Sequence, residues 1–122
     1  MEIKLQESER KVMEVLWKEG DLPARAIAQR LEEQVGWNVN TTYTLIKRCI
    51  AKGAIARTEP HFQCRALLAR DEVQRSAARE LIDKVFDGAA DQLFAALLSR
   101  ESLSREEIAR LKALVGQLDD VQ

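Results

Sequence analysis

Side chains able to do chemistry are few in this chain, and their spacing indicates no catalytic site. Its 122 residues include one His and two Cys, and the five Gly are scattered singly instead of forming a phosphate-binding loop. A nucleophile needs a nearby base and a third group that orients the base. Cys64 with His61 is the candidate pair, and nothing marks a third group. We therefore predict that the protein is not an enzyme and holds no cofactor and no metal.

The same residues allow an alternative interpretation, a regulator that responds to a metal or to oxidation. His61 and Cys64 lie three positions apart, and Cys49 is the other thiol. A switch built on these three residues could join two neighbouring elements. Cys49, however, falls on an apolar helical face, where a small buried side chain is expected. The metal or redox regulator is kept as an alternative.

The chemistry that the sequence does favour is contact with a polyanion. Hydroxyl groups and basic side chains crowd a predicted helix that begins near Asn40. Helix N-termini and hydroxyls bind phosphate or base edges, and Lys and Arg neutralise phosphates. Two further arginines lie on a predicted hairpin beyond the helix. The predicted DNA-binding residues are Asn40, Thr41, Thr42, Tyr43, Thr44, Lys47, Arg48, Arg57 and Arg65.

These residues need elements to position them, and the apolar spacing predicts three helices and a hairpin. Helical periodicity covers residues 7–19, 23–35 and 40–52, with glycines following each segment. After Gly53 the period changes, and residues 54–58 and 62–66 read as two strands of a small hairpin around a proline turn. Three helices and a hairpin in this order predict a winged helix-turn-helix, with residues 40–52 as its recognition helix.

The rest of the chain is predicted to be entirely helical. Asp71 with Gln74 and Ser104 with Glu107 have the spacing of capping boxes. The 52 residues from 71 to 122 bury too little surface to be stable alone, yet they offer three apolar helix faces. These faces could pack back on the first half, but we favour a core shared by two copies. The predicted dimerisation residues are Leu81, Ile82, Val85, Phe86, Leu93, Leu97, Leu111 and Leu114.

Charge follows the same division of the chain. Residues 1–70 hold 12 Lys and Arg against 9 Asp and Glu, a balance of +3, and residues 71–122 hold 7 against 11, a balance of −4. The longest apolar run, Leu93–Leu98, is far too short to cross a bilayer, and the first residues lack the apolar core of a signal peptide. We therefore predict a cytoplasmic, mainly α protein without membrane insertion. Its domains are a winged-helix DNA-binding domain, 1–70, and a helical dimerisation domain, 71–122.

Several motifs together resemble the BlaI/MecI/CopY family of winged-helix regulators, the penicillinase repressors. The first is Val12-Met13-Glu14-Val15-Leu16-Trp17 in the first predicted helix. The strongest runs from Gly36-Trp37 through Asn40–Arg48 to Lys52-Gly53, which is similar to the family's Trp, Ser-Thr, Thr-Leu-Leu-x-Arg and Lys-Gly signature. Ile82–Gly88 and Leu103–Ile108 match later parts of the family pattern. The resemblance spans nearly the whole chain.

This resemblance implies a homodimeric bacterial repressor that binds a near-palindromic operator. The third helix of each subunit would enter a major groove, with Thr41, Tyr43 and Thr44 at the groove and Arg48 nearby for backbone contact. Tyr43 stands where the family often has a basic residue, so the operator sequence need not carry over.

The resemblance also bears on how repression would be relieved. The antibiotic-resistance members are inactivated by cleavage of an Asn-Phe bond, which makes a sensor protease a further candidate partner. The matching pair in this chain is Ala96-Leu97, which lacks the Asn. The copper-responsive members carry C-terminal cysteines, and this chain has no Cys after Cys64. The releasing signal is therefore unidentified.

A second class of function is a winged helix that binds only other proteins. Such a module would neutralise no phosphates, so any affinity for DNA would not depend on salt. The position of Lys47 and Arg48 on the recognition helix favours the repressor over this alternative.

Overall fold

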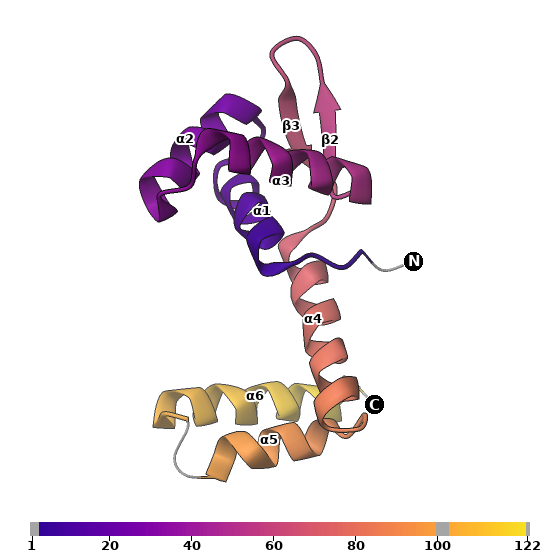
Figure 1. Cartoon of the computed structure of the whole chain (residues 1–122). Coiled ribbons are helices and arrows are strands. Elements are labelled where there is room, and N and C mark those ends of the chain that lie inside the picture. The colour runs from indigo at the N-terminus through magenta and orange to yellow at the C-terminus, as the bar shows by residue number, and fades with distance from the viewer. Residues whose placement is uncertain (1–2, 100–102, 122) are drawn as a thin grey trace. The chain divides into compact units, whose positions relative to one another are not determined.

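The structure is a computed structural model, and it describes residues 3–99 and 103–121, with side chains described as far as residue 117 (Figure 1). The predicted fold class is confirmed, since the described residues form a mainly helical protein with one small antiparallel sheet. In chain order the elements are α1 (Glu7–Glu19), β1 (Leu22–Pro23), α2 (Ala24–Val35), α3 (Val39–Lys52), β2 (Ile55–Thr58), β3 (Gln63–Ala66), α4 (Arg70–Val85), α5 (Ala90–Leu98) and α6 (Arg105–Val121).

The chain forms two compact units, Met1–Ala77 and Ala78–Gln122. We call them the winged-helix unit and the C-terminal unit, and α4 runs from the first into the second. The division of function between residues 1–70 and 71–122 stays a prediction.

The helices of the winged-helix unit begin and end where their terminal backbone groups find partners. At the start of α1 the Glu9 carboxylate accepts the Gln6 N–H at 2.8 Å. Both α2 and α3 end at a left-handed glycine, Gly36 with φ of 72° and Gly53 with φ of 85°. Glycine takes this conformation without the steric cost that a Cβ would add.

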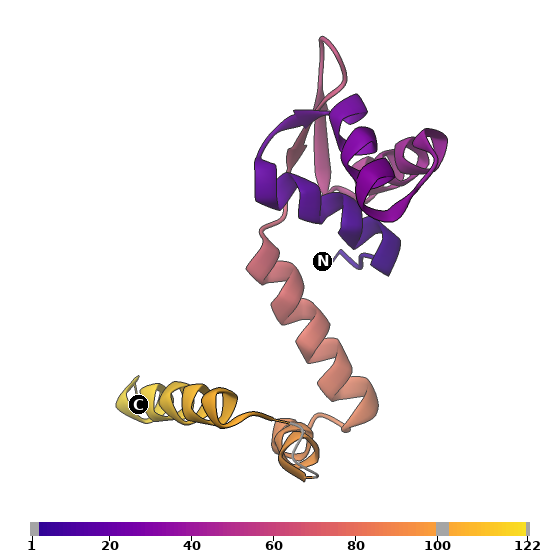
Figure 2. The ribbon, with the colours of Figure 1, turned by 90° about the vertical axis from the view of Figure 1, so that its left-hand side faces the viewer.

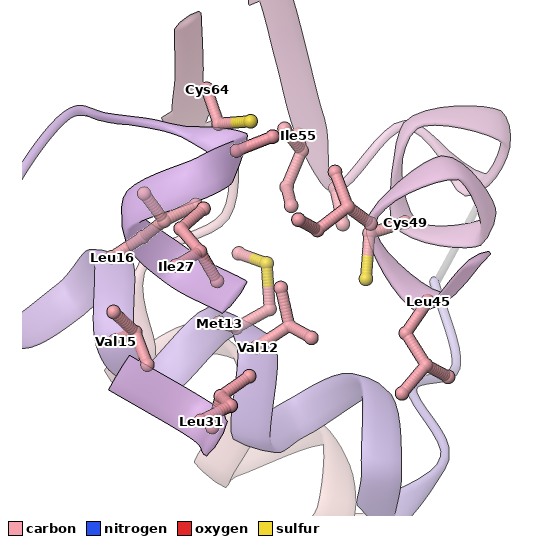
Figure 3. Packing of buried hydrophobic residues seen from close by; sticks show 13 residues of the cluster. Val12, Met13, Val15, Leu16, Ile27, Leu31, Leu45, Cys49, Ile55 and Cys64 are labelled. Atoms are coloured by element: carbon pink, nitrogen blue, oxygen red, sulfur yellow. The ribbon is translucent and has the colours of Figure 1, made fainter. Parts of the chain in front are cut away.

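The core of the winged-helix unit lies where its three helices meet the sheet (Figure 3). Met13 of α1, Ile27 of α2 and Ile46 of α3 are fully buried there, and Ile55 and Cys64 close the cluster from β2 and β3. The apolar side chains that recur at helical spacing in α1, α2 and α3 thus pack into one shared core, and this packing fixes the orientation of α3.

The sheet has three strands in the order β1-β3-β2, all antiparallel. The β2–β3 hairpin is the predicted wing, and it projects beyond the helices of its unit in both views (Figures 1 and 2). The third strand, β1, was not predicted, because two residues are too few to show an alternating pattern. It pairs Leu22 with Cys64 and Pro23 with Gln63.

The predicted cap of α4 is wrong, and that of α6 is confirmed. The helix α4 begins at Arg70, and its N-terminal bond runs from the Ala69 N–H to the Glu72 carboxylate at 3.0 Å instead of joining Asp71 to Gln74. At α6 the Ser104 N–H donates to the Glu107 carboxylate at 3.0 Å, and the Glu107 N–H donates to the Ser104 hydroxyl at 3.1 Å. This reciprocal pair is a complete capping box.

Candidate nucleic-acid interface

Helix α3 has one buried face and one exposed polar face. Thr42, Leu45, Ile46 and Cys49 are buried in the core of the winged-helix unit. On the other face we define a recognition stripe of exposed residues, which consists of Asn40, Thr41, Thr44, Lys47 and Arg48. Because helical residues three and four apart lie on the same side, these five side chains form one continuous surface along the helix.

The start of α3 is organised by Asn38 instead of Asn40. The Asn38 side-chain oxygen accepts the Asn40 N–H at 2.7 Å, which makes Asn38 the N-cap and leaves the Asn40 side chain exposed on the stripe. One turn later the Thr44 hydroxyl donates to the Asn40 carbonyl at 3.0 Å. The Thr44 oxygen keeps lone pairs for accepting a further hydrogen bond.

One predicted contact residue, Thr42, lies on the wrong face of α3. Its side chain is completely buried, and its hydroxyl has no hydrogen-bond partner among the described residues. Thr42 follows the same spacing as Leu45, Ile46 and Cys49, so its position in the helix turns it into the core. We therefore remove Thr42 from the set of residues that could touch DNA directly.

The two arginines of the wing lie on opposite faces of the hairpin. The strand register pairs Arg57 with Cys64 and Arg65 with Ala56. Since paired residues share a face and neighbours along a strand alternate, Arg57 belongs to the face of buried Cys64, and the exposed Arg65 belongs to the other. Arg57 is linked to α3 through Phe62, whose ring contacts both Arg57 and Tyr43.

Arg57 has two partners in the wing. Its Nε lies 3.2 Å from Glu59 Oε2, and its Cζ lies 3.6 Å from the centroid of the Phe62 ring. The hydrogen bond from Arg57 holds the pKa of the Glu59 carboxyl below its ordinary range. Phe62 in turn contacts Tyr43 of α3, with ring centroids 6.0 Å apart and planes at 59°.

The two thiols are buried in the core, and His61 is exposed in the wing turn. Burial, followed by the charge of Glu9, raises the pKa of Cys49 to about 12, and burial raises the pKa of Cys64 to about 11. Among the described side chains, which end at residue 117, no group of three His, Cys, Asp or Glu could hold a metal ion. The structure thus does not assemble the alternative site of Cys49, His61 and Cys64.

Both thiols are expected to be unreactive while the protein is folded. Thiolate is the reactive form, and a pKa raised from 9.0 to about 11 leaves about 100-fold less of it at neutral pH. The measurement is the rate of reaction with Ellman's reagent in buffer and in guanidinium chloride. We expect two slow thiols in buffer and two fast ones in denaturant. One fast thiol in the folded protein would show that burial does not control its reactivity.

The C-terminal unit has no core of its own among its described side chains. None of the described residues 78–117 is buried. Of the predicted dimerisation residues, Leu81, Val85 and Leu114 are exposed, and the other five, Ile82, Phe86, Leu93, Leu97 and Leu111, are half-buried. A groove of about 640 Å³ runs between α5 and α6, lined mainly by Phe94, Ala95, Leu98, Ile108, Leu111 and Val115.

Comparison with known proteins identifies the family. The sequence matches the Penicillinase repressor family over residues 5–117. The chain belongs to this family. Its members are transcriptional repressors and not enzymes, so this family member is a DNA-binding transcriptional repressor.

The individual relatives agree with the family match. The chain is 28% identical over 112 residues to the methicillin resistance regulatory protein MecI of Staphylococcus aureus strain N315. This alignment covers 90% of this chain and 91% of MecI. It is 23% identical over 118 residues to the penicillinase repressor of Bacillus licheniformis, covering 93% of this chain and 90% of that one. The solution structure of the DNA-binding domain of the repressor BlaI is similar in fold, with a TM-score of 0.53, 22% identity and coverage of 57% of this chain and 88% of the domain.

The position that would correspond to the family's cleavage bond lies inside a helix of this repressor. Ala96 and Leu97 belong to the last turns of α5, where the Ser99 hydroxyl donates to the Ala96 carbonyl at 2.9 Å. Peptide bonds in a hydrogen-bonded helix become open to proteolysis only by local unfolding. Ala96 and Leu97 stay a prediction by resemblance.

Sequence reasoning missed two features of this repressor's interface. The first is Phe62, which the predicted strand 62–66 includes but which lies just before β3 and contacts both Arg57 and Tyr43. The second is Glu59, whose ion pair with Arg57 was not predicted although the two residues are only two positions apart. The neighbouring Pro60 was the one sequence signal of a specialised turn here.

Proposed function

We propose that this repressor acts as a homodimer on a near-palindromic operator in the cytoplasm, with each α3 in a major groove. The observation that carries the proposal is the recognition stripe, a continuous exposed face with polar groups at its N-terminal end and two cations beyond them. The opposite face of α3 is buried, so the stripe is held rigidly by the core.

The side chains of the recognition stripe can make both base contacts and phosphate contacts with DNA. An Asn amide can donate to and accept from adenine, as the Asn40 side chain would here. The Thr44 hydroxyl already donates to the Asn40 carbonyl, so it would accept from the amino group of a cytosine or an adenine. Lys47 and Arg48 would bind phosphates and fix the position of α3 along the duplex.

The proposed dimer is supported by the C-terminal unit. No described side chain of α4, α5 or α6 is fully buried. Large apolar side chains are therefore exposed to water, among them Val85, Phe94, Leu98 and Val115. A unit of this size without its own core is not stable alone. A second copy, which carries the same apolar faces, would cover these groups under two-fold symmetry.

The signal that releases the repressor from DNA is not assigned. A sensor protease is a partner that the family resemblance allows, and Ala96-Leu97 would be its target, with local opening of α5 as a prerequisite. Among the described residues no helix is long and apolar enough to span a bilayer.

The proposed function is tested by selecting binding sites from a random DNA library at two salt concentrations. We expect a near-palindromic motif whose half-sites lie about one or more helical turns apart, with affinity that falls as salt rises. Recovery of no motif from a stable protein would contradict the proposal and favour a module that binds other proteins.

Replacing Arg48 with Ala is expected to weaken operator binding about equally for all sequences. If Arg48 contacts a phosphate, the slope of log K against log salt falls by about one for each subunit. The control is Lys18→Ala, an exposed cation in the last turn of α1, away from the recognition stripe. An unchanged slope in the Arg48 variant would remove this residue from the interface.

A further inference from the structure

An aromatic contact joins the turn of the wing to the recognition helix. The Phe62 ring lies 6.0 Å from the Tyr43 ring, at the tilted geometry that aromatic pairs prefer. The Arg57 guanidinium covers the Phe62 ring at 3.6 Å from its centroid, well within the range of a cation–π contact. Phe62 therefore holds side chains from β2 and from α3 at one point.

The backbone of Phe62 is fixed as well. Its carbonyl accepts the Ala24 N–H at the start of α2 at 2.9 Å. Its φ of 50° is in the left-handed region, which carries a steric cost for a residue with a Cβ. The contacts of Phe62 with α2, α3 and β2 offset this cost, and together they fix the direction of its ring.

Tyr43 occupies the place where this positioning would matter. It is half-buried and lies one turn before Lys47, at the edge of the recognition stripe on the side of the wing. It is also the one tyrosine of the chain. A phenol at the edge of a groove-binding helix offers a hydroxyl to base edges and a ring to a thymine methyl group.

We propose that Tyr43 determines part of the operator sequence and that Phe62 is the positioning residue that orients it. Arg57 completes the arrangement by covering the Phe62 ring, and Glu59 holds Arg57 in that place. This proposal rests on the proposed function, in which α3 enters the major groove. It predicts that the wing affects which bases are preferred as well as how tightly DNA is held.

The test is binding-site selection with the wild-type chain and four variants. Tyr43→Ala is expected to lose preference at particular base pairs of each half-site. Phe62→Leu, which keeps an apolar side chain and removes the ring, is expected to lose about 3- to 10-fold in preference at those same base pairs, with an unchanged salt slope. Phe62→Tyr, which keeps the ring, is expected to retain the wild-type preference.

The unfolding midpoint of Phe62→Leu shows whether this variant folds properly. Arg57→Met, the fourth variant, keeps the test decisive if it does not. Arg57→Met removes the exposed cover of the Phe62 ring while both rings remain, and it is expected to weaken preference at the same base pairs to a smaller extent. Wild-type preference in both Phe62→Leu and Arg57→Met would overturn the positioning role. Unchanged preference in Tyr43→Ala would overturn the role of Tyr43. If the wild-type chain selects no motif, the proposed function fails and this inference fails with it.

Discussion

Replacing Val115 with Asp is expected to raise the dissociation constant of the proposed homodimer at least about 100-fold. Val115 lines the groove between α5 and α6 and is 55% exposed in the single chain. In the proposed dimer this groove is covered by the partner, so two symmetry-related carboxylates would be taken out of water into a groove lined mainly by apolar side chains. A cost of about 3 kcal/mol for this burial corresponds to a factor of about 100 in the dissociation constant.

Because Val115 is exposed in the single chain, its replacement leaves the core of the winged-helix unit intact. Sedimentation equilibrium over a range of concentrations gives the oligomeric state, and operator binding should weaken in parallel. The matched control is Ala113→Asp, an exposed position on the opposite side of α6 that does not line the groove. If both variants dimerise like the wild type, the groove is not the interface.

The sequence predicted the winged helix well because its signals are local. Apolar residues at helical spacing set α1, α2 and α3, and the change to an alternating pattern after Gly53 marked β2 and β3. The positions that went wrong depend on neighbours. Thr42 is polar by type, but its place one turn before Leu45 and Ile46 puts it in the core.

The wing could not be predicted in detail because its register depends on the turn. A pairing shifted by one residue would have placed Arg57 and Arg65 on the same face of the hairpin. The left-handed conformation of Phe62 and its contact with Tyr43 follow from that turn, and no pattern of residue types specifies them. Two residues that act through geometry, Phe62 and Glu59, therefore emerged only from the structure.

An ion pair between the buried Glu9 and Lys52 was also not predicted from the sequence. The Glu9 side chain is 1% exposed, and its Oε1 lies 2.6 Å from Lys52 Nζ. Lys52 also donates to the Lys4 carbonyl at 2.9 Å, so the pair joins the first residues of the chain, α1 and the end of α3. Burial acts to raise the pKa of Glu9, but hydrogen bonds from Lys52 and the Gln6 N–H, with the charges of Lys52 and Arg48, lower it overall.

Replacing Lys52 with Met is expected to cost about 3–5 kcal/mol of unfolding free energy. The substitution leaves the Glu9 carboxylate buried without its cation, which is the expensive way to break a buried pair. Glu9→Gln should cost less, about 1–2 kcal/mol, because the Lys52 side chain is 35% exposed and can be hydrated when left alone. Urea unfolding of both variants and of the double variant at neutral pH measures the difference. An equal cost for the two single variants would contradict this account of the pair.

The pH dependence of the same variants separates charge from packing. The folded pKa of Glu9 lies below its ordinary value of 4.5, so its contribution is fully present above about pH 4.5 and is lost as the pH falls through the folded pKa. Glu9→Gln should lack this part of the acid destabilisation. In Lys52→Met the unpaired carboxylate is destabilising while it is ionised, and its protonation should narrow the gap to the wild type as the pH falls. If that gap stays constant between pH 7 and pH 4, the loss comes from the packing of the Lys52 side chain and not from an uncompensated charge.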